Sequence, residues 1–327
     1  ESSKYSSYVV GWPVTVFFSL HISRIIYPYF FQMDLEQDEY DVVIIGAGIS
    51  GLCAAFQLWR KDKDLRVVVL EAKDRIGGRT CYGELIGVNG PDTWDLGGQW
   101  IGHCQPHITA LIDELGLETY RQYVEGKKVL QLSDNNISTY TGNIPAIPWY
   151  ALIDLHLFIS KVDKLIKDID PEDPSTFPDA DLWDGKTFED IKKSMLWTHA
   201  ARQVVDISGR CVFGIEGSQV SALYYLIYCA AAGGIRPLIS AEPNIGGQEL
   251  KIKGGAWKVC ESLLERIGKE KVVLEQAVCQ IQQACTPTSV DDGVIIKTFG
   301  GSTYKCQRTV LALPPHQQGR FSMLCYI

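Results

Sequence analysis

Closely spaced cysteine pairs are the first feature that this sequence lacks. Its ten cysteines are scattered along the chain, and no two of them form a Cys-x-x-Cys pair. This scatter argues against a zinc ribbon or a disulfide-bonded scaffold and fits a protein of a reducing compartment. One local group of metal-ligand residue types, His103-Cys104 with His107, has no evident fourth ligand. We therefore predict an ordinary loop there and no metal site.

Positive charge is also scarce. Lys and Arg number 31 against 39 Asp and Glu, which gives a formal net charge of -8. Because an acidic chain without a basic block binds nucleic acid poorly, we expect no nucleic-acid partner. The 46% of hydrophobic and 21% of charged residues are those of a globular protein, and 327 residues suffice for one large domain or two ordinary ones.

A long uninterrupted apolar run is missing as well. Residues 8–31 are apolar and aromatic, but prolines and charged residues interrupt them, and their longest clean run is too short to span a bilayer. There is no charged segment or cleavage site of a secretory signal. The first methionine is Met33, so we expect residues 1–32 to be a non-native or disordered leader, with a membrane anchor as the alternative. The end at Ile327, just past a buried-strand pattern, predicts that the chain is a fragment.

The hydrophobic pattern changes twice along the chain. Asp41–Ile45 and Arg66–Leu70 are typical of strands buried on both faces, and Leu52–Trp59 between them has helical spacing, which predicts a β-α-β unit. The middle of the chain is mostly helical. From Gly254 the α/β pattern returns, with a hairpin signal at Gly300-Gly301 and a further buried strand after it. We therefore predict one nucleotide-binding domain interrupted by a helical insertion.

A glycine-rich turn follows the first strand. Gly46, Gly48 and Gly51 have G-x-G-x-x-G spacing and open a helix. The first glycine permits a tight turn, the second lets a pyrophosphate approach the backbone, and the third allows close helix–strand packing. The helix N-terminus adds N–H donors and positive partial charge for the phosphates. Glu71 ends the second strand, where a carboxylate can accept both ribose hydroxyls, so the pattern predicts a dinucleotide site.

Two further glycine clusters follow. The segment Glu71–Thr80 contains two glycines and Arg79, whose guanidinium can clamp a pyrophosphate from the other side. The segment Asp95–Gly102 supplies a second stretch of backbone that can approach a flat ring closely. Three such clusters close together predict a long, extended dinucleotide.

In this order the motifs resemble the flavin-containing amine oxidases, and most closely the monoamine oxidase branch. The resemblance runs from about Tyr40 to His316. Besides the three glycine segments, it includes Glu216–Tyr228, Asn244–Glu249, Lys253–Gly255, Leu274–Val278 and Ala312–Pro315. It implies an α/β fold, with an FAD-binding Rossmann-type domain of the glutathione-reductase-like class that a mostly helical substrate domain interrupts. The expected boundaries are 33–119 and 246–320 for the two parts of the FAD domain and 120–245 for the substrate domain, with the C-terminal half of the family fold missing.

The resemblance also implies which residues bind FAD. They are Gly46, Gly48, Ser50, Gly51, Glu71, Ala72, Lys73, Gly78, Arg79, Gly98, Gln99, Trp100 and Val278. Ser50 and the glycines around it would hold the pyrophosphate, Glu71 the ribose and Val278 the adenine. Lys73 stands where an arginine is common in the family, which would weaken a phosphate contact. The segment Gly98–Trp100 would lie beside the flavin ring.

The substrate cavity would be faced by Gln248, Ile239 and Cys211. For Ile239 and Cys211, plain core packing is the alternative, whereas a polar Gln248 next to a ring needs a partner. We assign no catalytic residue. The lysine, the aromatic pair and the flavin-attaching cysteine that the family uses would all lie beyond Ile327.

The implied activity is FAD-dependent oxidation of a primary amine by oxygen, which yields aldehyde, ammonia and hydrogen peroxide. Two alternatives stay open. One is a polyamine, putrescine or L-amino-acid oxidase, although Gly97–Trp100 favours the monoamine or putrescine type. The other is a truncated, inactive flavin-binding protein with exposed apolar edges.

The expected partners are a small amine and oxygen, together with a second copy of the chain in a homodimer. A membrane anchor would belong only to the missing C-terminal segment. We expect an intracellular location, in the cytoplasm or at the mitochondrial outer membrane. The glycosylation pattern Asn136-Ile137-Ser138 is treated as a chance match, because the cysteine usage argues against secretion.

Overall fold

The computed structural model describes residues 39–133, 137–283 and 293–325. The predicted leader, residues 1–32, and Asn136 of the glycosylation pattern lie outside these ranges. None of the helices within them is both long enough and apolar enough to cross a bilayer.

The described helices run in chain order through two groups. The α-helices are α1 (Ile49–Lys61), α2 (Pro106–Leu115), α3 (Trp149–Leu165), α4 (Ala180–Asp184), α5 (Phe188–Met195), α6 (His199–Phe213), α7 (Ala222–Ala231), α8 (Ile235–Ile239), α9 (Lys258–Ile267) and α10 (Pro315–Gln318). Short 3-10 turns are η1 (Ile166–Asp168), η2 (Pro174–Thr176), η3 (Gly217–Gln219) and η4 (Lys269–Lys271).

The described strands form one large sheet and three pairs. The large sheet contains β1 (Glu39–Ile45), β2 (Val67–Leu70), β9 (Val272–Val273), β10 (Val278–Gln283), β11 (Val294–Thr298), β12 (Thr303–Leu311) and β13 (Ser322–Cys325). The pairs are β3 (Tyr82–Gly87) with β4 (Gly90–Asp95), β5 (Thr119–Arg121) with β8 (Leu250–Ile252), and β6 (Lys128–Gln131) with β7 (Ile137–Tyr140).

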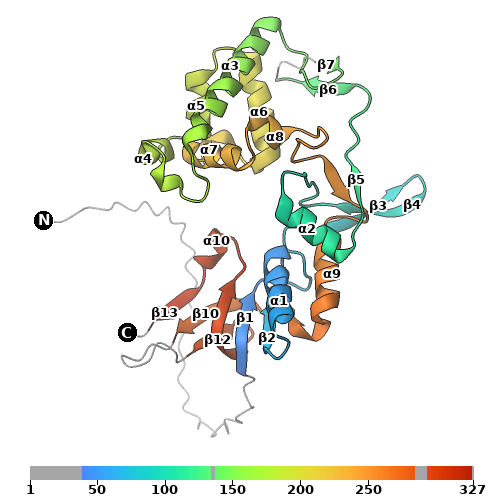
Figure 1. Cartoon of the computed structure of the whole chain (residues 1–327), viewed down its shortest axis with the longest axis vertical. Coiled ribbons are helices and arrows are strands. Elements are labelled where there is room, and N and C mark those ends of the chain that lie inside the picture. Colours follow the sequence, from blue (N-terminus) through green and yellow to red (C-terminus); the bar gives the residue numbers. More distant parts are fainter. Residues whose placement is uncertain (1–38, 134–136, 284–292, 326–327) are drawn as a thin grey trace, which may run out of the picture. The chain divides into compact units, whose positions relative to one another are not determined.

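The seven-stranded sheet has the order β13-β10-β11-β12-β1-β2-β9. Strand β1 pairs in parallel with both β12 and β2, so the two parts of the sheet that lie far apart in sequence meet at β1. The first strand is central and β2 is completely buried, which explains their continuous apolar sequences. Hydrophobic clusters lie on both faces. One contains α1, α2 and α9, and Figure 1 shows α1 and α9 side by side next to β1 and β2.

The end of this sheet differs from the expectation in one respect. The sequence predicts a strand over Ser302–Lys305 and a separate buried strand over Thr309–Leu313, whereas the structure has the single strand β12. Its first half pairs antiparallel with β11 and most of its length pairs in parallel with β1. The predicted hairpin turn is present, with Gly301 at a φ of 88° that favours glycine.

The β3–β4 hairpin was not predicted, because its sequence looks like a glycine-rich loop. Its strands pair from Tyr82↔Asp95 to Gly87↔Gly90, and Gly90 has a φ of 108° at the turn. Many of its side chains are exposed, including Ile86, so it lacks the apolar alternation that identifies a half-buried strand.

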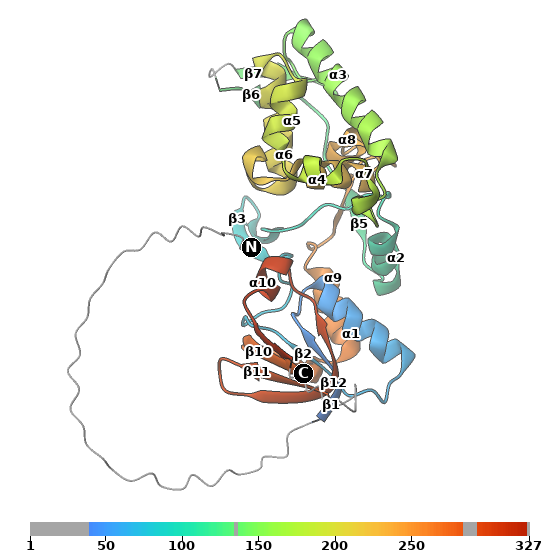
Figure 2. The same ribbon diagram turned by 90° about the vertical axis from the view of Figure 1, so that its left-hand side faces the viewer.

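Helices α3 to α8 gather into a group of their own in both views (Figures 1 and 2). They share one hydrophobic cluster, in which Phe158 and Phe188 are almost completely buried. A buried carboxylate sets the start of α6. Asp154 on α3 accepts hydrogen bonds from the backbone N–H and the hydroxyl of Thr198, both at 2.7 Å, and Thr198 in turn caps α6. This bond joins α3 to α6.

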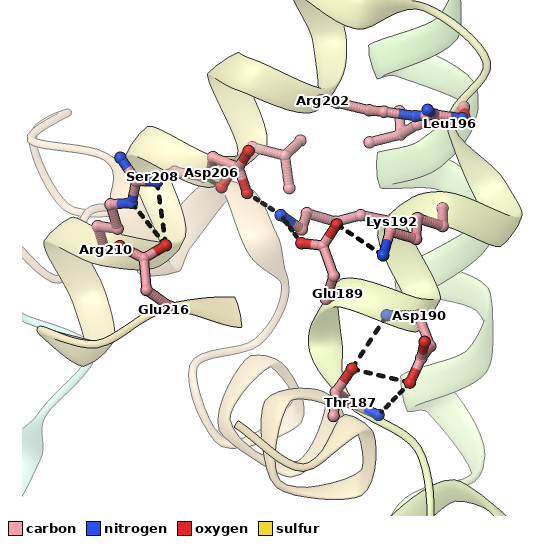
Figure 3. Close-up of polar contacts among 12 residues, drawn as sticks. Thr187, Glu189, Asp190, Lys192, Leu196, Arg202, Asp206, Ser208, Arg210 and Glu216 are labelled. Carbon is pink, nitrogen blue, oxygen red and sulfur yellow. Dashed lines mark hydrogen bonds and ion pairs between the residues drawn. The ribbon is translucent and has the colours of Figure 1, made fainter. Parts of the chain in front are cut away.

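A buried charge joins α5 to α6. Lys192 is 2% exposed, and its ammonium pairs with Glu189 at 2.5 Å and with Asp206 on α6, as Figure 3 shows. The pKa of Glu189 is lowered, chiefly because Lys192 donates a hydrogen bond to it. Close packing accompanies the pair, since a Cβ on Gly209 of α6 would lie 2.7 Å from the Phe188 ring. The ion pairs and this contact therefore fix α6 against α5.

Candidate functional site

The turn between β1 and α1 has the three glycine geometries that the motif predicts. Gly46 has a φ of 107°, and a Cβ there would lie 2.8 Å from the Ala312 carbonyl oxygen. A Cβ on Gly51 would lie 1.9 Å from the Gly46 carbonyl oxygen, so the helix packs directly on the turn. Gly48 differs from both, because no atom of the described residues comes within 4 Å of an added Cβ. The open space at Gly48 is where a ligand can approach the backbone.

The first turn of α1 offers N–H groups that no side chain caps. Gly48 is its N-cap residue and has no side chain to bond the first turn, and the first turn, which includes Ser50, holds no acidic residue. The first N–H groups of a helix have no partner within the helix and carry positive partial charge. This end of α1 can therefore receive phosphate oxygens.

Glu71 lies at the carboxyl end of β2, next to the same turn. Its side chain is 8% exposed, and its two oxygens accept hydrogen bonds from the backbone N–H groups of Ala47 at 2.8 Å and Lys73 at 3.0 Å. A carboxylate has about four lone-pair sites, so acceptor capacity is left for hydroxyl groups. Both Ala72 and Lys73 are exposed at the surface beside it.

The other glycine segments lie against this turn. The Gly77 N–H donates to the Ala47 carbonyl at 2.9 Å, and a Cβ on Gly78 would meet only the Cα of Gly48, at 3.5 Å, among the described atoms. The Gly98 N–H donates to the carbonyl of Arg79 at 3.1 Å. The three glycine clusters that the sequence separates are therefore neighbours in space.

A fourth segment, the residues that lead into β10, also lies next to Glu71. The Gln276 N–H donates to the Glu71 carbonyl at 2.8 Å, and the Glu275 N–H donates to the Lys73 carbonyl at 3.0 Å. Val278 begins β10 two residues later and is buried. The Gln276 side-chain oxygen is buried and has no hydrogen-bond partner among the described residues, so it can accept from a ligand.

These features fit the adenine, ribose and pyrophosphate of FAD. The chain offers an uncapped helix N-terminus, a carboxylate at a strand end and, at Gly48, backbone with open space above it. Trp100 and Gln99 follow in the third cluster, where Trp100 is 42% exposed and its indole N–H donates to Gln122 at 2.9 Å. That bond fixes the ring's orientation.

The three predicted substrate residues line one cavity of about 240 Å³. Cys211, Ile239 and Gln248 come from α6, α8 and the loop before β8. The rest of the lining is Leu130, Tyr140, Pro145, Val204, Ile207, Ser208 and Val212. None of these described lining residues carries a charge. Helix α6 supplies half of the wall, because its residues at spacings of three and four share one face.

The structure also shows residues that sequence reasoning missed. Tyr140 and Ser208 bring hydroxyl groups to the cavity wall, and Glu249, next to Gln248, is buried and bonded to His103. Ser208 lies three residues before Cys211 on the same helix, so helical spacing alone could have placed it on the cavity face. Nothing in the sequence signals the His103–Glu249 contact, since it joins residues 146 positions apart.

The buried thiols of the described chain are poor nucleophiles. Burial raises the pKa of the Cys229 thiol to about 12 and that of Cys306 to about 11, and it also raises the pKa of Cys260. These thiols stay protonated at neutral pH and are weak nucleophiles. Cys104 and Cys211 are exposed.

We expect iodoacetamide at a pH of about 7.5 to alkylate Cys104 and Cys211 in the folded chain and to spare Cys229, Cys260 and Cys306. Peptide mapping by mass spectrometry measures this, with the urea-unfolded chain as the control in which all five react alike. Fast alkylation of Cys229 in the folded chain would contradict the packing of α7.

Comparisons with known proteins identify what the fold and the site resemble. Residues 49–320 match the model of the family described as "Flavin containing amine oxidoreductase". The "Probable flavin-containing monoamine oxidase A" of Dictyostelium discoideum is 36% identical over 283 residues, and "Amine oxidase [flavin-containing] A" of Canis lupus familiaris is 35% identical over 283 residues. Each alignment covers 86% of this chain, but only 59% and 51% of those relatives.

Solved structures agree with these relatives. A putrescine oxidase bound to putrescine superimposes with a TM-score of 0.75 at 29% identity, and a cyclohexylamine oxidase from Brevibacterium oxydans with 0.76 at 28%. Each covers 88% of this chain and 60% of the other. The chain therefore spans about half to three fifths of the proteins it matches. The resemblance and the α/β, FAD-binding Rossmann-type fold class are confirmed.

Proposed function

The chain belongs to the flavin-containing amine oxidoreductase family, whose cofactor is FAD, and on that premise we propose that it forms the FAD site and part of the substrate pocket of a primary-amine oxidase. The reaction converts an amine, oxygen and water into aldehyde, ammonia and hydrogen peroxide. FAD, when bound, would supply the redox chemistry of this reaction, as acceptor of the hydride equivalent and donor of electrons to oxygen. The proposal includes an FAD domain in two parts, 33–119 and 246–320, and a substrate domain, 120–245. The substrate domain supplies most of the cavity wall, and Gln248 comes from the second part of the FAD domain.

The residues around the β1–α1 turn would hold FAD. The N–H groups at the start of α1 and the guanidinium of Arg79 bind the pyrophosphate, while Gly48 and Gly78 let it come close to the backbone. Glu71 accepts the ribose hydroxyls, and the backbone at Val278 lies against the adenine. Ala72 and Lys73 border the ribose and phosphate, and Gly98–Trp100 lie beside the flavin ring.

The cavity selects and prepares the amine. Its uncharged, largely apolar wall disfavours the ammonium form by desolvation, so it favours the neutral amine, which is the reactive form. Ile239 and Cys211 form part of the apolar wall, and the Gln248 amide orients the polar end of the substrate. A volume of about 240 Å³ lies below the usual range for ligand pockets, which starts at about 300 Å³, and this suits a small amine.

The observation that carries the choice of substrate is the absence of a charged residue in the described cavity wall. A diamine such as putrescine would bury its second ammonium there without a carboxylate partner, which is costly. A monoamine with an uncharged tail has no such cost. The runner-up, a putrescine oxidase, rests on the likeness to the solved putrescine oxidase.

A panel of benzylamine, cyclohexylamine, putrescine and L-leucine tests the proposal. We expect the FAD-loaded chain to bind the two monoamines at least about tenfold more tightly than putrescine, as measured by calorimetry. Hydrogen peroxide formation is measured in parallel. Tighter binding of putrescine would favour the runner-up, and binding of flavin and amine without any peroxide would favour the inactive, truncated protein.

The matched variant is Ser208→Asp, which adds a carboxylate to the wall. We expect it to raise the affinity for putrescine and lower that for benzylamine, because the new charge compensates the second ammonium. An unchanged preference would show that this cavity does not hold the tail of the substrate.

A further inference from the structure

A buried carboxylate follows a residue of the cavity wall in sequence. Glu249 follows Gln248 in sequence and is 1% exposed. One of its oxygens, Oε2, accepts two hydrogen bonds at 2.8 Å, from Nδ1 of His103 and from the backbone N–H of Asn244. No donor among the described residues reaches its other oxygen, Oε1.

Such an arrangement is costly by itself. Burying a carboxylate with an unsatisfied oxygen lowers stability, so the two donors on Oε2 must hold the group in place against that cost. Bonds to an ionised acceptor are the stronger kind, which makes the loss of either donor consequential. The Asn244 backbone has a φ of 63°, a left-handed conformation that asparagine adopts more readily than most other residues.

Glu249 also joins two other segments through its backbone. Its carbonyl accepts from the Gln122 N–H at 2.7 Å, and the Gln122 side chain accepts the indole N–H of Trp100 at 2.9 Å. The next residue, Leu250, exchanges two backbone hydrogen bonds with Ile101, at 2.8 and 2.9 Å. The strands β5 and β8 pair antiparallel next to these contacts, from Thr119↔Ile252 to Arg121↔Leu250.

The segment before Glu249 is a closed loop, residues 240–248. The Gln248 N–H donates to the Ser240 carbonyl at 3.1 Å, so the loop returns to the end of α8, which carries Ile239. The loop lies directly on the segment that follows Trp100. A Cβ on Gly102 would come within 2.4 Å of the Gly246 carbonyl oxygen and 2.8 Å of the Gly247 Cα.

We propose that Glu249 and His103 are positioning residues that clamp loop 240–248, and with it Ile239 and Gln248, onto Ile101–His103 and thereby set its position against the adjoining segment Gly98–Trp100. This inference rests on the proposed function, in which that segment borders the flavin ring and the loop borders the amine. The clamp sets the placement of the cavity wall relative to the ring. Neither residue touches the reacting atoms.

His103→Leu is the test variant, because the His103 side chain is half exposed and its loss leaves the core intact. His103→Gln keeps an N–H donor for Glu249. His107→Leu, an exposed histidine nearby on α2, is the matched control. Hydrogen exchange of peptides covering residues 241–250 and calorimetric binding of benzylamine to the FAD-loaded chain are the two readouts.

We expect His103→Leu to speed amide exchange in 241–250 about tenfold and to weaken benzylamine binding by a similar factor, with α9 peptides unchanged. His103→Gln should stay within about threefold of the unsubstituted chain, and His107→Leu should match it. Unchanged exchange in His103→Leu would overturn the clamp. Faster exchange with unchanged benzylamine affinity would also overturn the proposal, by reducing the pair to a purely structural contact.

The two proposals fail in different ways. If the unsubstituted chain binds none of the amines, the proposed function fails. Hydrogen exchange of loop 240–248 in the His103 variants then still decides whether the clamp exists.

Discussion

Replacing Gly48 with valine is expected to lower FAD affinity by at least about 100-fold while leaving the fold intact. Gly48 has extended backbone, with a φ of -78°, and no described atom lies within 4 Å of an added Cβ. Valine therefore fits the folded chain but occupies the space through which the pyrophosphate approaches the backbone. Fluorescence titration with FAD measures the affinity, and thermal unfolding of the flavin-free chain measures the fold.

Gly51→Ala is the matched comparison, with the opposite expectation. A Cβ at Gly51 would lie 1.9 Å from the Gly46 carbonyl oxygen, so the helix must move away from the turn. We expect a clear loss of thermal stability in the flavin-free chain. Full FAD affinity in Gly48→Val would show that the pyrophosphate does not lie at this turn.

Removing both carboxylates that face Lys192 is expected to lower the stability of the folded chain strongly. In the double variant Glu189→Gln, Asp206→Asn, a lysine that is 2% exposed loses both charged partners. An uncompensated buried charge costs about 3–5 kcal/mol, which corresponds to a fall in Tm of about 10 °C. Urea unfolding and thermal unfolding measure this loss of stability.

Lys192→Met is expected to lower the free energy of unfolding by less than half as much as the double variant does. The remaining carboxylates are each about a third exposed and can be hydrated, and methionine fills the apolar space beside Phe188. Lys253→Ala, which removes the exposed pair with Glu118, should leave the Tm essentially unchanged. A double variant as stable as the unsubstituted chain would contradict the pairing shown in Figure 3.

The pairing of Lys192 with Glu189 should also make the stability of the folded chain depend on pH. Lys192 lowers the pKa of Glu189 in the folded chain below its ordinary value of 4.5, so the unfolded chain binds more protons in acid. The stabilisation is complete above a pH of about 4.5 and is lost as the pH falls through the lowered pKa. Lys192→Met should flatten this acid limb of the stability curve, as measured by urea unfolding at several pH values.

The sequence by itself determined the parts of the site that depend on neighbours along the chain. An apolar strand followed by Gly46, Gly48 and Gly51 and then by helical spacing leaves few other conformations, because glycine freedom, strand burial and helix periodicity all act within a few residues. The acid at the next strand end, Glu71, follows from the same β-α-β geometry. The cavity residues came from the family resemblance, and the structure places Cys211, Ile239 and Gln248 together.

Only the tertiary structure decided the contacts between distant segments. His103 meets Glu249 across 146 residues, Lys192 of α5 meets Asp206 of α6, and β12 continues as one strand because β1 offers it a partner. No local rule marks Glu249 as buried or Lys192 as paired, since a charged residue is exposed unless another element happens to bring it a partner. Those partners depend on the register of strands and the direction of side chains, which are set only when the whole chain packs.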